Sequence, residues 1–252
     1  MFQKNCDKIL SFLKPHDLVL DVGGWACPFN RANYVLDAEP FETRGFYKTV
    51  GMAAFQGPPE ESFSQATWIQ RDICDKKPWP FADKQFDFAI CSHVLEDIRD
   101  PLFVCQELSR VAKRGYIEVP SRLTESCRGH EEANVVGLSH HRWLIEIEPD
   151  GSLAFVQKYH FIHSHWRFSF PRKFMMQLSA QDKVLSCWWD GEIRSHEILI
   201  HGLKQQRESL AGFIQKVRPY SPLMLKASDA MNQFFGVTHR ILGKIRRLIG
   251  VK

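Results

Sequence analysis

The sequence predicts an α/β protein with a doubly wound, mostly parallel sheet. Two observations lead to this prediction: short apolar runs recur along the first half of the chain, and segments with helical spacing separate them. Strands that alternate with helices form parallel sheets, because each connection must bring the chain back to the end where the previous strand began. The runs that we expect to form strands are 18–22, 34–37, 68–72, 86–90 and 116–119.

Helices are expected before the first strand and before the fifth. Apolar residues recur at helical spacing from Phe2 to Leu13, and again after Asp100 and Pro101. Proline suits the first helical turn, where its missing N–H is no loss. A parallel crossover normally takes a dozen or more residues. Because Asp37 comes only 16 positions after Asp21, we expect the first crossover helix to be reduced to a turn or a loop.

The second half of the chain has antiparallel patterns. We expect one hairpin over 142–158, around Pro149-Asp150-Gly151, and a second over 184–201, around Asp190-Gly191. Asp-Gly is a favoured two-residue hairpin turn, which makes the second pattern the stronger one. Beyond it the pattern becomes helical and basic.

Composition excludes several classes of protein. The 252 residues are 44% hydrophobic and 25% charged, which excludes collagen, a coiled-coil rod and a wholly disordered chain. The seven cysteines form no C-x-x-C pair and no even disulfide framework, so we expect a cytoplasmic protein. There is no run of 18 apolar residues that could span a membrane.

The net charge of +4 is unevenly distributed. Residues 204–252 hold ten Lys or Arg and two acids, a balance of +8, so residues 1–203 carry −4. The basic character belongs to the tail, and we therefore expect no nucleic-acid partner for the body of the chain. Residues 236–252 have the pattern of a basic amphipathic helix, suited to peripheral contact with the inner face of a membrane. The alternative is a helix that docks on its own domain.

Three acids stand where the first three strands end. Asp21 precedes Gly23 and Gly24, Asp37 ends the second strand, and Asp72 follows the third. In a parallel sheet, ligands bind at the carboxyl ends of the strands. Asp37 is placed to accept hydrogen bonds from a ribose diol, and Asp72 with Ile73 could bracket an adenine. The alternative is that Asp and Gly simply form turns after strands.

Several motifs together resemble the class I S-adenosylmethionine-dependent methyltransferases. The run from Val19 to Gly24, the acid at Asp37 and Arg71-Asp72-Ile73 are similar to that family's successive cofactor motifs. The stretch 78–87 resembles the family's "lPf-d-sFD" segment, and 91–101 its "S-H-V-L-E-H-v-x-D-P" segment. The resemblance covers about residues 15–122. The glycine loop departs from the family's G-x-G-x-G, with Trp25 and Cys27 in place of further glycines, which weakens the expected methionine-end contacts more than the adenosine-end ones.

The resemblance implies a Rossmann-like sheet of seven strands and S-adenosylmethionine as cofactor. It implies a methyltransferase-like domain over 1–203, with a cofactor half (15–122) and a substrate half (123–203), followed by a helical extension (204–252). A nicotinamide cofactor is disfavoured, because no G-x-G-x-x-G opens a helix. The expected cofactor-binding residues are Asp21, Gly23, Gly24, Asp37, Asp72, Ile73, Ser92 and His93.

Histidines supply the candidate catalytic groups. Methyl transfer to a hydroxyl requires removal of its proton, and the pKa of histidine suits this task. His93 follows the fourth strand, beside the cofactor region, and His140 and His141 lie beyond the fifth strand, where a Glu could orient one of them. Cys127, His130 and His140 offer zinc-ligand types, but their spacing matches no zinc pattern, and we expect no metal site.

The expected activity is methyl transfer to an oxygen or nitrogen nucleophile of a small molecule or glycan. The alternative is a catalytically inactive methyltransferase-like module that docks a partner or a membrane through its basic tail. Neither the acceptor nor the oligomeric state follows from the sequence.

Overall fold

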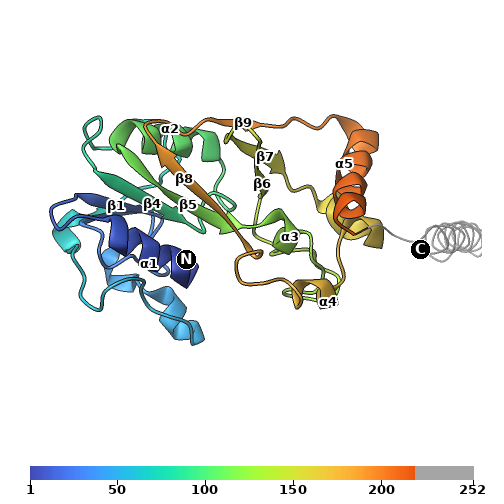
Figure 1. The fold of residues 1–252 in the computed structure, drawn as a ribbon, viewed down its shortest axis with the longest axis horizontal. Coiled ribbons are helices and arrows are strands. Elements are labelled where there is room, and N and C mark those ends of the chain that lie inside the picture. The colour runs from blue at the N-terminus through green and yellow to red at the C-terminus, as the bar shows by residue number, and fades with distance from the viewer. Residues whose placement is uncertain (219–252) are drawn as a thin grey trace, which may run out of the picture.

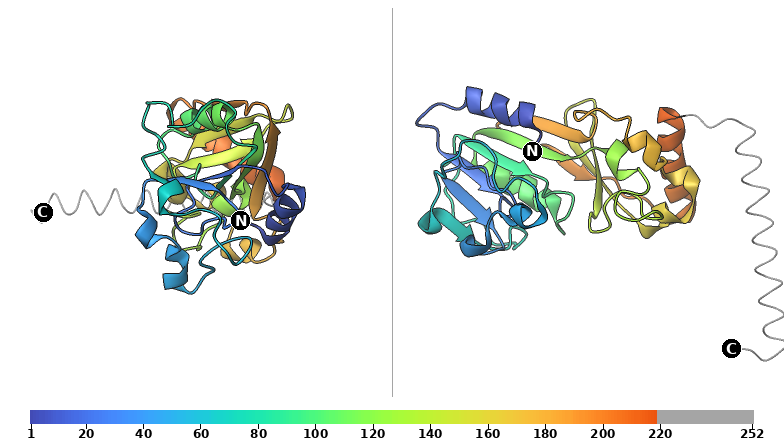
Figure 2. Two further views of the ribbon diagram at one scale, coloured as in Figure 1. Left: turned by 90° about the vertical axis from the view of Figure 1, so that its left-hand side faces the viewer. Right: turned by 90° about the horizontal axis from the view of Figure 1, so that it is seen from below.

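A six-stranded sheet lies at one end of the elongated molecule, and helix α5 (Gly202–Val217) lies at the other, as the computed structural model shows (Figures 1 and 2). The structure describes residues 1–218. The strand order is β3-β2-β1-β4-β5-β8; the first five strands are parallel, and β8 is antiparallel to β5. The strands are β1 (Val19–Val22), β2 (Tyr34–Asp37), β3 (Trp68–Gln70), β4 (Phe88–Ser92), β5 (Arg114–Pro120) and β8 (Val184–Asp190).

Helices cover both faces of this sheet. Helix α1 (Gln3–Phe12) packs Cys6 and Ile9 against one face, and α2 (Pro101–Val111) packs Val104 and Leu108 against the other. All four residues of β1 are buried, as expected for a parallel strand with both faces covered. The predicted α/β, doubly wound class is confirmed.

Helix α2 begins where the sequence predicts. The carboxylate of Asp100 caps it by accepting a hydrogen bond of 2.9 Å from the amide of Phe103, and Pro101 occupies the first turn. This cap fixes the end of the 91–101 segment beside the carboxyl end of β4.

The connection from β1 to β2 contains no helix. Residues 23–33 run as turns and loop, and the amide of Asn33 returns to the carbonyl of Val19 at 2.8 Å. The predicted loss of the first crossover helix is confirmed. A short chain segment therefore forms the wall beside β1 that a helix would otherwise form.

A second sheet has three strands in the order β6-β7-β9: β6 (Trp143–Ile147), β7 (Leu153–Gln157) and β9 (Ser195–Glu197). β6 and β7 are antiparallel, which confirms the predicted hairpin over 142–158. The predicted hairpin over 184–201 is wrong, because β8 pairs with β5 and β9 pairs in parallel with β7.

The Asp190-Gly191 turn carries the chain from one sheet to the other instead of folding it back. Gly115 on β5 leaves room for this arrangement, since a Cβ there would lie 2.6 Å from the ring of Trp189. With three strands in a separate sheet, the main sheet has six described strands and not the expected seven.

Helix α5 and several short helices are the other helical elements in the described part of the chain. Helix α5 packs Ile214 against Cys127 and Phe170 of the substrate half. The remaining helices are α3 (Arg122–Glu125), α4 (Arg172–Met175), η1 (Phe41–Thr43), η2 (Phe46–Val50), η3 (Gln65–Thr67), η4 (His160–Ser164) and η5 (Trp166–Phe168).

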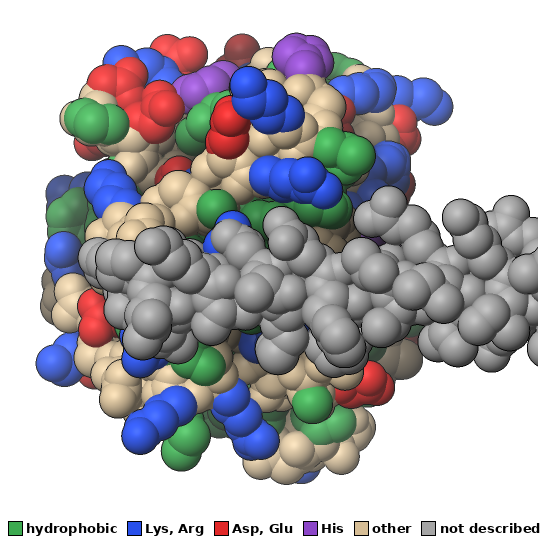
Figure 3. Space-filling view, turned by 90° about the vertical axis from the view of Figure 1, so that its right-hand side faces the viewer, with side chains coloured by type: hydrophobic (Ala, Val, Ile, Leu, Met, Phe, Trp, Pro, Cys, Tyr) green, Lys and Arg blue, Asp and Glu red, His purple; other side chains and the backbone are tan. Residues whose placement is uncertain are grey.

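The face at the α5 end carries Lys and Arg side chains among hydrophobic and acidic ones, without one dominant patch in its visible described part (Figure 3). The amphipathic pattern over 236–252 lies outside the described residues. Within residues 1–218, no helix combines the length and the apolar character that crossing a membrane requires.

Candidate active site

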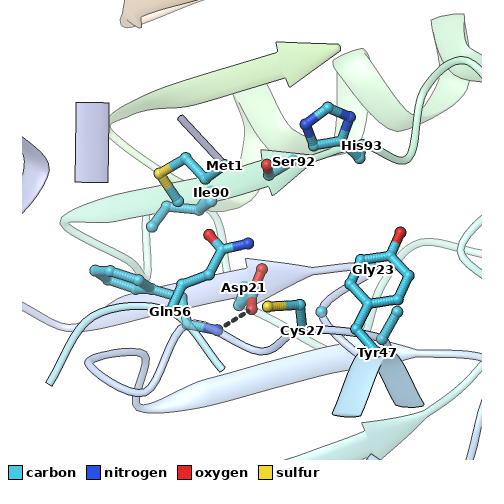
Figure 4. A pocket seen from close by; sticks show the side chains of 12 residues that line it. Met1, Asp21, Gly23, Cys27, Tyr47, Gln56, Ile90, Ser92 and His93 are labelled. Carbon is cyan, nitrogen blue, oxygen red and sulfur yellow. Dashed lines mark hydrogen bonds between the residues drawn. The ribbon is translucent and has the colours of Figure 1, made fainter. Parts of the chain in front are cut away.

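A cleft opens at the carboxyl ends of β1, β2 and β4, where doubly wound sheets bind ligands. Its volume is about 340 Å³. A narrow inner hollow of about 50 Å³ lies next to it toward β1 and shares four of its residues (Figure 4). The cleft is lined by Gly23, Trp25, Ala26, Asp37, Ala38, Phe46, Tyr47, Asp72, Ile73, His93, Val94, Asp97 and Ile98.

Asp21 lies on the wall of the inner hollow. Its side chain is buried, and its Oδ2 atom accepts a hydrogen bond of 2.8 Å from the amide of Phe29 (Figure 4). Burial raises the pKa of Asp21 to about 7, against the opposing effect of the Phe29 hydrogen bond. A nearby cation would favour the ionised carboxylate, so this wall suits a positively charged ligand group.

The two glycines after β1 are required by their surroundings. A Cβ on Gly24 would lie 2.2 Å from Oδ2 of Asp21. Gly23 has a φ of +76°, and a Cβ there would lie 2.3 Å from a methyl carbon of Val94. Any side chain at these positions would push into the junction of the cleft and the inner hollow.

Asp37 fixes the loop that forms the cleft wall. Its Oδ2 accepts a hydrogen bond from the Trp25 amide, and its Oδ1 accepts one from the Glu39 amide, both at 2.9 Å. Burial raises the pKa of Asp37, while these amides lower it. The carboxylate lines the cleft and retains acceptor capacity for a ligand hydroxyl.

Asp72 lies at the far end of the cleft and is half exposed. Its Oδ1 accepts from the Cys74 amide at 2.9 Å, and its Oδ2 pairs with Arg99 at 2.7 Å. Burial raises the pKa of Asp72, but the two partners outweigh it and the pKa is lowered. Ile73 lines the cleft beside this carboxylate, and Ile98 contributes a second apolar side chain.

Ser92 ends β4 on the opposite wall, and His93 follows it. The Ser92 Oγ atom is buried and has no hydrogen-bond partner in the described part of the chain, although Ser92 lines the inner hollow. The His93 ring lies between two carboxylates, with Nε2 3.2 Å from Glu118 and Nδ1 3.5 Å from Glu96. Burial lowers the pKa of His93, but the two carboxylates raise it to about 9.

His141 lies behind the rim of the cleft and is buried. Its Nδ1 atom is 2.9 Å from Oε1 of Glu125, whose other oxygen is 2.7 Å from Nζ of Lys158. Its Nε2 atom is 3.6 Å from Oδ1 of Asp97, which lines the cleft. The sequence prediction that a Glu orients one of the two adjacent histidines therefore agrees with this geometry.

His140 stands beside His141 and is exposed. Its Nε2 atom is 4.0 Å from the same oxygen of Asp97, and its Nδ1 atom is 3.6 Å from Glu131. Within residues 1–218, Asp97, His140 and His141 are the one group of three ligand-type side chains whose donor atoms lie within 4.8 Å of one another. The alternative set of Cys127, His130 and His140 is not brought together.

The structure gathers the predicted cofactor residues around the cleft and its inner hollow. It places the predicted histidine pair against Asp97, which lines the cleft. Sequence reasoning missed Asp97, Tyr47 and the stacked rings of Trp25 and Phe46, whose centroids are 5.0 Å apart. Asp97 had a detectable signal, because it stands where the family segment quoted above has a histidine. Tyr47 and Phe46 had none, since they lie in the short helix η2, which no pattern in the sequence indicated.

Comparison with known proteins agrees with this geometry. Residues 48–117 match the family model described as a methyltransferase domain. The resemblance to methyltransferases is confirmed. The matched segment runs from η2 into β5 and includes the methyltransferase motifs around Asp72, Ser92 and His93. No curated protein gives a significant match.

Solved methyltransferases give weak structural matches. One is an S-adenosylmethionine-dependent methyltransferase from Mesorhizobium loti, with 16% identity over 60% of this chain and 63% of that chain and a TM-score of 0.31. Another is from Aquifex aeolicus, with 20% identity over 47% of this chain and 65% of that chain and a TM-score of 0.28. An arsenic(III) S-adenosylmethionine methyltransferase from Chlamydomonas reinhardtii matches at 17% identity, over 42% of this chain and 39% of that one, with a TM-score of 0.28. Each is matched over less than two thirds of its length, and scores this low carry no weight for function.

Proposed function

We propose that this chain transfers a methyl group from S-adenosylmethionine to an oxygen or nitrogen nucleophile of a small molecule or a glycan. The observation that supports this most is the placement of Asp21, Asp37 and Asp72 around one continuous space at the ends of adjacent strands. The match of residues 48–117 to a methyltransferase domain supports the same general activity.

The cleft fits the adenosine end of this cofactor. Asp37 would accept hydrogen bonds from the ribose hydroxyls, and Asp72 would accept one from the exocyclic amine of adenine. Ile73 and Ile98 would cover the faces of the base, because both are apolar and line the same stretch of cleft. These roles need acceptors and apolar surface, which the four side chains supply.

The inner hollow fits the methionine end. Asp21 would hold the ammonium group, since a cation favours the ionised form of its carboxylate. The orphaned Ser92 hydroxyl would gain a hydrogen-bond partner, and protonated His93 would attract the carboxylate of the cofactor. The absence of side chains at Gly23 and Gly24 leaves room for these contacts.

Bound S-adenosylmethionine would supply an electrophilic methyl group, and the chain must supply an oriented nucleophile. We assign the acceptor side to the rim, where His140 and His141 stand beside Asp97 and could receive a proton from an acceptor hydroxyl. We assign His93 to the cofactor side rather than to proton removal, because its two carboxylate partners keep it protonated at neutral pH.

Calorimetric titration with S-adenosylmethionine and S-adenosylhomocysteine tests the cofactor assignment. We expect one binding site per chain, and at least a tenfold loss of affinity in Asp37→Asn, which keeps the shape of the side chain but loses its charge. Glu60→Gln removes an exposed carboxylate outside the cleft lining and should bind as the parent does.

A parallel titration with a nicotinamide cofactor should give no heat of binding. The assignment fails if the parent chain binds neither S-adenosyl compound, or if Asp37→Asn binds as tightly as the parent while both melt at the same temperature.

A further inference from the structure

The rim of the cleft holds three donor atoms of types that bind metal ions. They are Oδ1 of Asp97 and Nε2 of both His140 and His141, with separations of 4.0 Å and 3.6 Å from the Asp97 oxygen. A tetrahedral zinc ion with bonds of about 2.0–2.1 Å needs donors about 3.4 Å apart. The present spacing is wider, with the three donor atoms within 4.8 Å of one another, and a rotation of the exposed His140 side chain would be needed to close the difference.

The carboxylate oxygen of this group is also free to bind an ion. Oδ1 of Asp97 is buried and has no hydrogen-bond partner within residues 1–218, because its distances to both imidazoles exceed hydrogen-bond length. A buried carboxylate oxygen without a hydrogen bond carries a desolvation cost, which the two imidazoles offset only in part. A cation placed between the three atoms would remove that cost.

A second layer of side chains supports the two histidines. Glu125 accepts a hydrogen bond from Nδ1 of His141 at 2.9 Å, and Glu131 lies 3.6 Å from Nδ1 of His140. Metal-binding histidines commonly direct their other ring nitrogen at a carboxylate, which fixes the tautomer and leaves Nε2 free for the ion. Lys158 neutralises Glu125 at 2.7 Å. The negative charge that remains for an ion comes from Asp97, Glu131 and the nearby Glu96, which faces His93 at 3.5 Å.

We propose that Asp97, His140 and His141 form a binding site for a divalent transition-metal ion, with Zn²⁺ as the best-fitting member of the class. Two imidazoles and one carboxylate are the ligand set of many open zinc and transition-metal sites, in which further positions remain for water or substrate. The proposal replaces the sequence-based expectation that the chain has no metal site.

The location gives the ion a role that rests on the proposed function. Asp97 lines the cleft, so the ion would stand beside the cleft that we assign to the cofactor. A divalent ion lowers the pKa of a hydroxyl that it binds. It would thus let an acceptor oxygen lose its proton to water. With the ion bound, both histidines would act as ligands, and this replaces the proton-accepting role proposed for them above.

Metal binding can be tested without cofactor or acceptor. We would strip the purified full chain with a chelator, titrate it with Zn²⁺ in competition with a chromophoric chelator, and record the visible spectrum after adding Co²⁺. We expect one ion per chain and a Co²⁺ spectrum of low coordination number. His140→Ala and Asp97→Asn should each weaken Zn²⁺ binding at least tenfold.

Two other histidines provide matched controls. His130 and His196 are exposed, and His130→Ala and His196→Ala should bind Zn²⁺ as the parent does. His140 is 60% exposed, so its replacement should not alter the melting temperature. If folded His140→Ala binds Zn²⁺ as tightly as the parent, the proposed site is wrong. The site is also wrong if adding Co²⁺ to the parent leaves the spectrum of free Co²⁺ unaltered. If the parent binds Zn²⁺ but does not bind S-adenosylhomocysteine, the proposed function is wrong and the metal site stands.

Discussion

The Nδ1 atom of His141 lies 2.9 Å from Oε1 of Glu125, and both side chains are buried. Glu125 also pairs with Lys158, which is 3% exposed. The chain therefore holds a carboxylate, a cation and an imidazole out of water directly behind the rim of the cleft. Such an arrangement is costly to break, because removing one member leaves another charged and unpaired.

Removing one partner of the Lys158–Glu125 pair should destabilise the protein strongly. In Lys158→Met the apolar stem stays, but Glu125 loses its cation in a buried site. We expect the free energy of unfolding to fall by about 3–5 kcal/mol, as measured by urea denaturation. The control is Lys113→Met, which breaks a surface pair with Asp87 and should cost less than about 1 kcal/mol. Equal losses in the two variants would contradict the buried-pair account.

Asp21 should make stability depend on pH. Its pKa is raised to about 7 by burial, whereas an unfolded aspartate titrates near pH 4. Between about pH 4 and pH 7 the unfolded chain releases this proton while the folded chain keeps it, so this carboxyl lowers stability as pH rises.

Asp21→Asn removes this dependence. Relative to the parent, the variant should gain up to about 4 kcal/mol of unfolding free energy between pH 4 and pH 7, with no further change above pH 8. Denaturation curves across this range measure the difference, and a difference that does not vary with pH would show that Asp21 is ionised in the folded protein.

Gly24→Ala should damage the inner hollow directly. The new Cβ would lie 2.2 Å from Oδ2 of Asp21, so either the carboxylate or the loop must move. We expect at least a tenfold loss of S-adenosylhomocysteine affinity by calorimetry, together with lower stability.

Gly212→Ala serves as the control for the glycine variant. Gly212 lies within α5, where a Cβ would meet nothing within 4 Å. This change should leave binding intact and stabilise the protein by about 0.5–1 kcal/mol, since alanine favours a helix. Unaltered binding in Gly24→Ala would mean that the ligand does not reach this junction.

Local sequence patterns predicted most of the main sheet. The runs that became β1 to β5 are apolar and short, and Asp100-Pro101 marks the start of α2 unambiguously. The short interval between Asp21 and Asp37 also sufficed to predict a crossover without a helix. In each case the deciding information lies within a few neighbouring residues.

The failures depend on partners distant in sequence. Asp190-Gly191 has the chemistry of a hairpin turn, but β8 pairs with β5 and Trp189 packs over Gly115, more than 70 residues away. The rim cluster was equally hidden, since Asp97 and the His140-His141 pair meet only when the loops after β4 and α3 fold together. Their spacing in sequence matches no metal motif, so only the folded chain reveals the group.

The measurement that tests the account most directly is a crystal structure of the full chain with S-adenosylhomocysteine. We predict that the adenine lies beside Asp72 and Ile73, that the ribose hydroxyls bond to Asp37, and that the amino-acid end lies between Asp21 and His93. A ligand bound elsewhere on the chain, or a cleft without ligand at concentrations that saturate known methyltransferases, would contradict the assignment of this cleft as the cofactor site.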